Sequence, residues 1–243
     1  MNDSILKLVS EIKSARRIVF FGGAGVSTSS GIPDFRSSSG LYHKDYGGVS
    51  AEEILSHHYF VQYPDRFYHF LKDKMLYLDA CPNYVHDFIA RLEHDTDKDI
   101  TVITQNIDGL HQKAGSKNVI ELHGNILDYY CMGCGKAYDV SCLKDDVPMC
   151  SCGAMIRPYV VLYEEPLDED SISYAIKTIQ QADLMVVIGT SLAVQPAASM
   201  VQYFRGKCLA IVNQSKTDYD SIADVVIHDD LVSVFKKIDS YFE

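Results

Sequence analysis

The chain has 243 residues, a formal net charge of −11 and 47% apolar residues. The negative charge, and the lack of any basic run longer than two residues, argue against binding to nucleic acid. No apolar run reaches the roughly 18 residues that a membrane-spanning helix requires, so we expect a globular protein with no membrane partner.

The first residues lack the basic and apolar regions of a secretory leader. The seven cysteines are an odd number, which argues against a framework of disulfides. We therefore expect a cytoplasmic protein.

Apolar residues recur at helical spacing from Ile5 to Ile12, which predicts an amphipathic helix over about residues 3–15. The apolar run at residues 17–22 predicts the first strand. Further strands are expected at 100–104, 119–122, 184–189, 208–212 and 225–227, and further helices at 171–182, 196–204 and 231–238. This alternation predicts an α/β fold, a Rossmann-type doubly wound parallel sheet.

Two stretches do not fit the alternation and predict a smaller domain. Residues 40–95 contain several helical patterns, and residues 125–157 are rich in cysteine. The predicted small domain, helical plus metal-binding, therefore comprises residues 40–95 with 125–157. The Rossmann-type domain comprises residues 1–39 with 96–124 and 158–243.

A glycine-rich loop, Gly23-Ala24-Gly25, directly follows the first predicted strand. Glycines let a backbone approach a pyrophosphate, and a helix N-terminus supplies free N–H donors. The third glycine of the dinucleotide fingerprint is replaced by Thr28, so the glycine pair alone is a weak signal. The loop continues into a reactive extension at residues 32–36, which reads IPDFR.

Two other polar clusters follow predicted strands. They read TQNID at residues 104–108 and ELHG at residues 121–124. Because open α/β sheets bind ligands at the carboxyl ends of their strands, we expect these clusters and the glycine loop to form one site.

Taken together, the segments GAGVSTSSGIPDFR, TQNID and LHG resemble the sirtuin family of NAD-dependent protein deacylases. Residues 189–192 and 211–213 also fit, so the resemblance extends over nearly the whole chain. It implies an NAD-dependent protein-lysine deacetylase, which cleaves NAD to nicotinamide and transfers the acyl group from lysine to ADP-ribose. The Rossmann-type domain would bind NAD as a co-substrate, and the partner would be an acetyl-lysine-bearing protein or peptide.

The resemblance implies that His123 and Asn106 are catalytic. His123 occupies the position of the general base, and imidazole suits that role because its pKa lies near working pH. It would take a proton from a ribose hydroxyl after the acyl-lysine oxygen has displaced nicotinamide. The residues implied in NAD binding are Ala24, Gly25, Thr28, Phe35, Arg36, Gln105, Ile107, Asp108, His123, Thr190, Ser191, Asn213 and Asp229.

Five cysteines lie within a 22-residue window and predict a zinc site. A Cys-x-x-Cys knuckle at Cys131 and Cys134 is followed, after fifteen residues, by Cys150 and Cys152. The second pair is one residue shorter than is usual in the family, so Cys142 in place of Cys152 remains an alternative. Four thiolates complete a tetrahedron, so we expect one structural zinc ion.

The resemblance places the acyl-lysine peptide between the two domains, along residues 160–165. Many relatives read Val-Val-x-Phe-Gly-Glu here, after Arg-Pro-Asp. In this chain Tyr159 replaces the aspartate, Tyr163 the phenylalanine and Glu164 the glycine. We expect the loss of this glycine to affect the affinity for the peptide, although the peptide can still pair with the segment as an added strand.

Sirtuins that remove succinyl or malonyl groups carry a Tyr-x-x-Arg pair, which here reads Tyr68 and Leu71. Leucine cannot pair with a carboxylate, so we expect acetyl or longer neutral acyl groups as substrates.

Three other functions remain as alternatives. A nicotinamide dehydrogenase would recycle NAD, and an NAD-dependent mono-ADP-ribosyltransferase would transfer ADP-ribose onto protein. A zinc-ribbon binding module would have lost catalysis, against which the presence of Asn106, Asp108 and His123 argues.

Overall fold

The computed structural model describes residues 2–37, 40–43 and 46–242. Its centre is a six-stranded sheet with the order β3-β2-β1-β7-β8-β9, in which every neighbouring pair is parallel. The strands are β1 (Arg17–Gly22), β2 (Asp99–Thr104), β3 (Val119–Glu121), β7 (Leu184–Ile188), β8 (Cys208–Val212) and β9 (Val225–Ile227). Numbered within this sheet alone, the order is 3-2-1-4-5-6, so the predicted Rossmann-type doubly wound sheet is confirmed.

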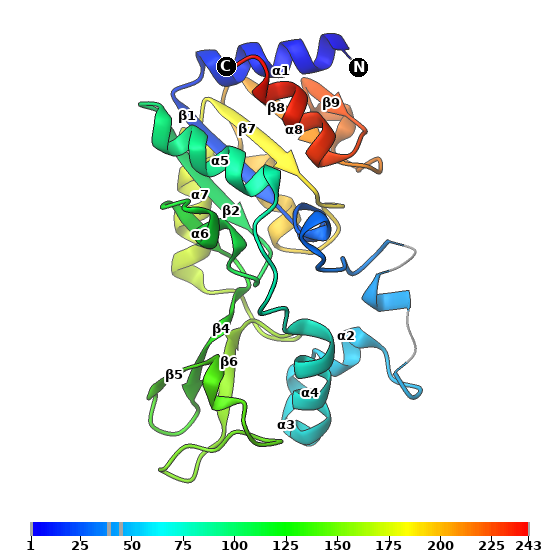
Figure 1. The fold of residues 1–243 in the computed structure, drawn as a ribbon, viewed down its shortest axis with the longest axis vertical. Coiled ribbons are helices and arrows are strands. Elements are labelled where there is room, and N and C mark those ends of the chain that lie inside the picture. Colours follow the sequence, from blue (N-terminus) through cyan, green and yellow to red (C-terminus); the bar gives the residue numbers. More distant parts are fainter. Residues whose placement is uncertain (1, 38–39, 44–45, 243) are drawn as a thin grey trace.

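The central strands are continuous apolar runs because both faces of the sheet are covered. All five residues of β7 are fully buried, and so is β1 from Ile18 to Gly22. One face packs against α1 (Asn2–Ser14), α5 (Tyr84–Asp95) and α8 (Leu231–Asp239), and the other against α7 (Glu169–Gln181) and a 3-10 helix (Ala197–Tyr203) (Figure 1).

Side chains cap most of these helices at the expected ends. The Asp168 carboxylate accepts a hydrogen bond from the Ser171 amide at the start of α7, and Asp230 does the same for Ser233 in α8. The helix predicted at residues 196–204 is instead a 3-10 helix. It begins after Pro196, whose carbonyl accepts both the amide and the hydroxyl of Ser199, and this i to i+3 pairing gives the tighter coil.

The smaller unit contains an antiparallel sheet and a group of short helices, which lie side by side below the large sheet in Figure 1. The sheet has the order β5-β4-β6, and Phe60 and Phe67 of the helices share a core with Ile126 of β4. The elements are β4 (Gly124–Cys131), β5 (Ala137–Asp139), β6 (Ile156–Val160), α2 (Ala51–Ile54), α3 (His57–Gln62), α4 (Pro64–Phe70) and a π-helical turn (Leu71–Met75).

Short elements complete the chain. They are α6 (Leu110–Ala114) and 3-10 turns at Ala24–Val26, Thr28–Ser30, Leu41–His43, Val140–Cys142 and Asp220–Ile222. None of the helices in the described ranges is long and apolar enough to cross a membrane.

Helix α5 lies within residues 40–95, which the sequence assigned to the predicted smaller domain, and it packs against the large sheet. Val85, Phe88 and Ile89 belong to the core of the large sheet, and the ring centroid of Phe88 lies 5.3 Å from that of Phe235 in α8. The predicted boundary at residue 158 also divides β6, which pairs with β4 as far as Val160. Packing against distant partners, and not local helical pattern, decides which unit a helix joins.

Candidate functional site

A cavity of about 800 Å³ lies at the carboxyl edge of the large sheet, between that sheet and the smaller unit. The loops that follow β1, β2, β7 and β8 line one side, and residues of the smaller unit line the other. The implied site residues that line it are Ala24, Gly25, Thr28, Phe35, Arg36, Gln105, Asn106, Ile107, Asp108, His123, Thr190, Ser191 and Asn213. The structure therefore brings together the three motifs that the sequence analysis singled out.

The glycine loop crosses between β1 and β7, the point where the strand order reverses. The Gly23 amide donates to the carbonyl of Ile188, and the Gly25 amide donates to that of Gly189 at 2.8 Å. A Cβ atom on Gly25 would lie 2.8 Å from the Gly189 oxygen, so only glycine allows this approach. The loop thus occupies the place where doubly wound sheets bind nucleotides.

A hydrogen-bonded network joins this loop to the one after β2. The Ser27 hydroxyl donates to Asp108 Oδ2 at 2.6 Å and accepts from Asn106 Nδ2 at 3.1 Å. Ser27 is only 1% exposed, and Asn106 is 9% exposed. The network holds an amide and a carboxylate in fixed orientations at the floor of the cavity.

Burial raises the pKa of Asp108, while hydrogen bonds from Ser27 and from the Leu110 amide oppose this shift. Both carboxylate oxygens thus have a donor within the protein.

Gln105 connects the β2 loop to the loop after β7. Its Nε2 donates to Thr190 Oγ1 at 3.2 Å, and the same oxygen accepts the amide of Leu192 at 3.1 Å. At the far end of the cavity, Asn213 Nδ2 donates to the carbonyl of Ser215. Residues implied in binding the two halves of one dinucleotide thus line a continuous wall.

The imidazole of His123 is held in one orientation and one tautomer. Its Nδ1–H donates to the carbonyl of Gln105 at 2.8 Å, because a carbonyl oxygen can only accept. The neutral ring therefore keeps Nε2 unprotonated and able to take a proton. Burial lowers the pKa of His123, and the bond to Gln105 opposes this shift only in part.

The glycine after His123 is required by the packing. Gly124 has a φ of 77°, and a Cβ atom there would lie 2.0 Å from the carbonyl oxygen of Tyr159. This close approach lets β4 begin beside β6 directly after His123. It therefore holds His123 where the large sheet and the smaller unit meet.

Phe35 and Arg36 lie against the smaller unit. The Phe35 ring centroid is 5.2 Å from that of Tyr42, and the Arg36 guanidinium carbon is 5.2 Å from the same Tyr42 ring. The Tyr42 hydroxyl is hydrogen-bonded to that of Tyr163, which joins this loop to the predicted peptide-binding segment.

Asp229 is the one implied NAD-binding residue that does not line the cavity. Its Oδ2 lies 3.8 Å from Lys237 Nζ, and the neighbouring Asp230 lines the cavity instead. The loop after β9 turns there to start α8, whose N-terminus the Asp230 side chain caps.

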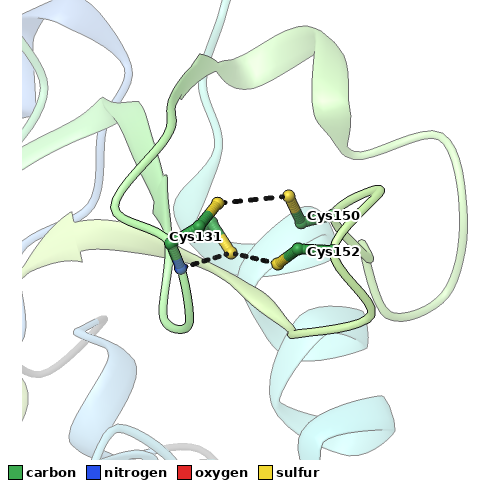
Figure 2. A group of neighbouring side chains, drawn as sticks. Cys131, Cys150 and Cys152 are labelled. Carbon is green, nitrogen blue, oxygen red and sulfur yellow. Dashed lines mark hydrogen bonds between the residues drawn. The ribbon is translucent and has the colours of Figure 1, made fainter.

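The four predicted zinc ligands converge in the smaller unit. The Sγ atoms of Cys131, Cys134, Cys150 and Cys152 all lie within 4.8 Å of one another. Figure 2 shows Cys131 on one side of the group, facing Cys150 and Cys152 on the other. The Sγ atoms of Cys131 and Cys152 lie 3.4 Å apart, and those of Cys134 and Cys150 lie 3.7 Å apart. Zinc–sulfur bonds of about 2.3 Å in a tetrahedron separate sulfur atoms by roughly 3.8 Å, so the four thiols fit one zinc ion.

Neighbouring groups donate hydrogen bonds to these sulfurs. The amides of Gly133 and Cys134 each lie 3.4 Å from Cys131 Sγ, and the Tyr138 hydroxyl donates to Cys150 Sγ at 3.1 Å. Such donors stabilise thiolates. Cys142 is not part of this group of four sulfur atoms, which favours Cys152 as the fourth ligand.

Part of the cavity wall in the smaller unit is apolar, where Phe67, Leu71, Met75 and Ile126 line it. Lys74 also lines the cavity, and its ammonium group pairs with Asp73 at 2.9 Å. Tyr68, by contrast, is fully buried, and its hydroxyl donates to the carbonyl of Ile156 outside the cavity. Neither position of the Tyr-x-x-Leu segment offers a partner to a carboxylate.

A model of the Sir2 family matches residues 23–196, which include the glycine loop, both other motifs and the cysteine cluster. The chain belongs to the Sir2 family. This Sir2 chain is 49% identical, over 98% of its own length and 99% of the relative's, to a Clostridium perfringens protein named NAD-dependent protein deacetylase.

Solved structures of Sir2 proteins agree with this Sir2 chain along its length. One holds a deacetylated p53 peptide and 3'-O-acetyl-ADP-ribose, and it matches with a TM-score of 0.89 and 38% identity over 98% of both chains. Another, a Sir2 with p53 peptide and NAD+, matches with a TM-score of 0.86 and 38% identity over 97% of both chains. The sirtuin resemblance is thereby confirmed.

Ser27 is a site residue of this Sir2 chain that the sequence analysis did not single out. It stands in the quoted glycine loop between Val26 and Thr28, so the motif contained it. The local sequence does not show which of three consecutive small side chains turns inward. The buried Ser27 contacts residues 106 and 108, whereas Thr28 is exposed and its hydroxyl donates to the carbonyl of Gly25.

Proposed function

We propose that this Sir2 chain is an NAD-dependent protein-lysine deacetylase, which cleaves NAD to nicotinamide and transfers the acyl group from lysine to ADP-ribose. One observation carries the proposal. His123, with an unprotonated Nε2, lies on the same cavity as the glycine loop and the Asn106–Ser27–Asp108 network. The named activity of the Clostridium perfringens relative and the ligands of the Sir2 structures support it.

NAD supplies the ribose carbon that the acyl oxygen attacks and the nicotinamide that leaves. The glycine loop at Ala24, Gly25 and Thr28 would lie against the pyrophosphate, because glycines let the backbone approach it closely. Asp108 and Ile107 would line the nicotinamide pocket under Phe35. Thr190, Ser191 and Asn213 would hold the adenosine half.

His123 acts as the general base. Because its Nδ1–H is held by Gln105, the free Nε2 can take a proton from a ribose hydroxyl and activate it toward the acyl carbon. The lowered pKa keeps the ring neutral at physiological pH, which is the form that a base requires. Asn106, fixed by Ser27, orients the ribose side of the site.

The acyl group would enter along the apolar wall formed by Phe67, Leu71 and Ile126, with the peptide beside residues 160–165. Burying a carboxylate on this wall without a partner is costly. The wall therefore favours acetyl and longer neutral acyl groups.

The zinc ion is structural. Four thiolates would fill its coordination sphere and leave no position for water or substrate. Its role is to hold together the loops between β4 and β6.

We also infer a large unit that binds NAD and a small unit that carries zinc, with the substrate between them. A cytoplasmic location accords with thiols that are unpaired throughout the chain, because oxidising compartments favour disulfides.

The deciding experiment incubates the purified protein with NAD and an acetyl-lysine peptide and follows the products by mass spectrometry, beside the His123→Ala variant. Equal amounts of nicotinamide, deacetylated peptide and O-acetyl-ADP-ribose are expected, all lost in the variant. Transfer of ADP-ribose onto protein without deacetylation would favour the mono-ADP-ribosyltransferase. Reduction of NAD would favour a dehydrogenase.

A further inference from the structure

Glu164 stands at the end of the predicted peptide-binding segment in a backbone conformation that favours glycine. Its φ is 75°, in the left-handed region, where the Cβ atom of an ordinary residue is crowded. A charged residue persists in such a conformation when its surroundings determine it.

The side chain of Glu164 supplies these surroundings. Its Oε2 accepts the backbone amide of His58 at 3.0 Å, and its Oε1 lies 2.8 Å from His58 Nδ1. The His58 amide, together with the imidazole, lowers the pKa of Glu164, so the carboxylate remains ionised. Both carboxylate oxygens of Glu164 are thus hydrogen-bonded to the first turn of α3.

These contacts between Glu164 and α3 stabilise one side of the cavity. Tyr163 and Glu164 both line the cavity, and the Tyr163 backbone is hydrogen-bonded to the backbone of Leu55 and His57. Two residues earlier, the Val161 amide donates to the carbonyl of His123. The segment therefore runs from the catalytic histidine to α3, with Glu164 as its last anchor.

The adjacent Glu165 has a different role. Burial alone would raise its pKa, but hydrogen bonds from Arg157, the Leu162 amide and His57 lower it to about 2. Arg157 is 7% exposed, so this ion pair belongs to the core of the smaller unit. Glu164 and His58 are half exposed and contribute little to that core.

We propose that Glu164 is a positioning residue for the acyl-lysine peptide. Hydrogen bonds from His58 to its carboxylate stabilise the left-handed backbone conformation of Glu164, and this conformation fixes the backbone path of residues 160–164. In this chain, hydrogen bonds to the side chain stabilise a positive φ that a glycine would adopt without them. This inference rests on the proposed function, because it assigns the segment to the peptide substrate.

The test compares Glu164→Ala, Glu164→Gly and His58→Ala. Anisotropy of a fluorescein-labelled acetyl-lysine peptide measures binding apart from turnover, and steady-state kinetics give kcat and both KM values. Glu164→Ala should weaken peptide binding about tenfold, and His58→Ala should weaken it less, because the backbone amide of residue 58 still binds Glu164. In both variants kcat and the KM for NAD should change less than about twofold. Glu164→Gly should restore binding to within about twofold, because glycine adopts a φ of 75° freely.

Two further variants sharpen the result. His58→Ala added to Glu164→Gly should have no further effect, because glycine needs no anchor. His94→Ala is the matched control, since His94 forms an exposed pair with Asp95 far from the cavity. Unchanged peptide binding in Glu164→Ala, or binding in Glu164→Gly as weak as in Glu164→Ala, would overturn the proposal.

Melting temperatures identify any variant that fails to fold, in which case the glycine variant alone decides. If the unaltered protein neither binds the peptide nor releases nicotinamide, the proposed function itself fails, and this result is distinct from any outcome with the variants.

Discussion

The Ser27 hydroxyl donates a 2.6 Å hydrogen bond to Asp108, although 81 residues separate the two in sequence. The same oxygen accepts from Asn106, so one buried hydroxyl orients both polar groups of the β2 loop. Ser27→Ala would leave an amide and a carboxylate without this partner, which costs about 1–3 kcal/mol for each buried group left unsatisfied. We expect kcat/KM for deacetylation to fall about tenfold or more.

Nicotinamide release at varied NAD checks this expectation. Ser14→Ala is the control, because that hydroxyl bonds only to its own helix. Full activity of Ser27→Ala would show that Asn106 and Asp108 hold their positions without it.

The loss of activity at low pH depends on the pKa of His123. Burial lowers the pKa of this imidazole, and the base must be neutral, so activity is lost only when the pH falls through that lowered value. We expect the acid limb of the kcat/KM profile to lie below the ordinary imidazole value of about 6.5. His123→Ala should lose at least about 100-fold in rate. A limb at or above pH 7 would contradict the assignment.

Two other histidines make the fold sensitive to acid. His86 and His111 are fully buried with ring centroids 4.6 Å apart, and burial lowers their pKa values to about 3 and about 4. Both rings are neutral in the folded chain and bind protons when it unfolds. Stability should therefore fall as the pH drops below about 6.5, by about 2 kcal/mol for each histidine between pH 7 and pH 5.

Urea unfolding of the zinc-loaded protein at the two pH values measures this loss. His111→Gln should lose about 2 kcal/mol less between them than the unaltered chain. The control is His94→Gln, whose side chain is 75% exposed. Equal losses in His111→Gln and the unaltered chain would rule out this source of acid sensitivity.

Zinc content distinguishes the two cysteines that compete for the fourth ligand position. The geometry predicts one zinc ion per chain, retained by Cys142→Ala and lost or much weakened in Cys152→Ala. Elemental analysis after gel filtration gives the stoichiometry. A chelator should lower the melting temperature of the unaltered protein, because a closed thiolate site contributes directly to folding. Zinc loss from Cys142→Ala alone would reverse the assignment.

The apolar wall predicts which acyl groups are removed. Acetyl-lysine and butyryl-lysine peptides should both be substrates, whereas succinyl-lysine should react with a kcat/KM at least about 100-fold lower. Leu71 offers no charge to the succinyl carboxylate, and the Tyr68 hydroxyl is occupied by Ile156. Mass spectrometry of matched peptides measures the three rates. Efficient removal of succinate would show that another residue binds its carboxylate.

The amino-acid sequence alone predicts the elements and motifs that depend on neighbouring residues. Continuous apolar runs specify the six parallel strands, since strands buried on both faces need no polar side. The glycine loop, the motifs that contain Asn106 and His123, and the cysteine pairs are equally local, because their chemistry requires particular residues at short spacings.

The tertiary structure alone decides what depends on distant partners. The strand order brings Ser27 to Asp108, and packing on α8 assigns α5 to the large unit. The turn after β9 takes Asp229 away from the cavity, and His58 stabilises a left-handed Glu164 that local preference disfavours. Local preferences are set by the conformational energy of adjacent residues, whereas these contacts arise only when the sheet brings distant segments together.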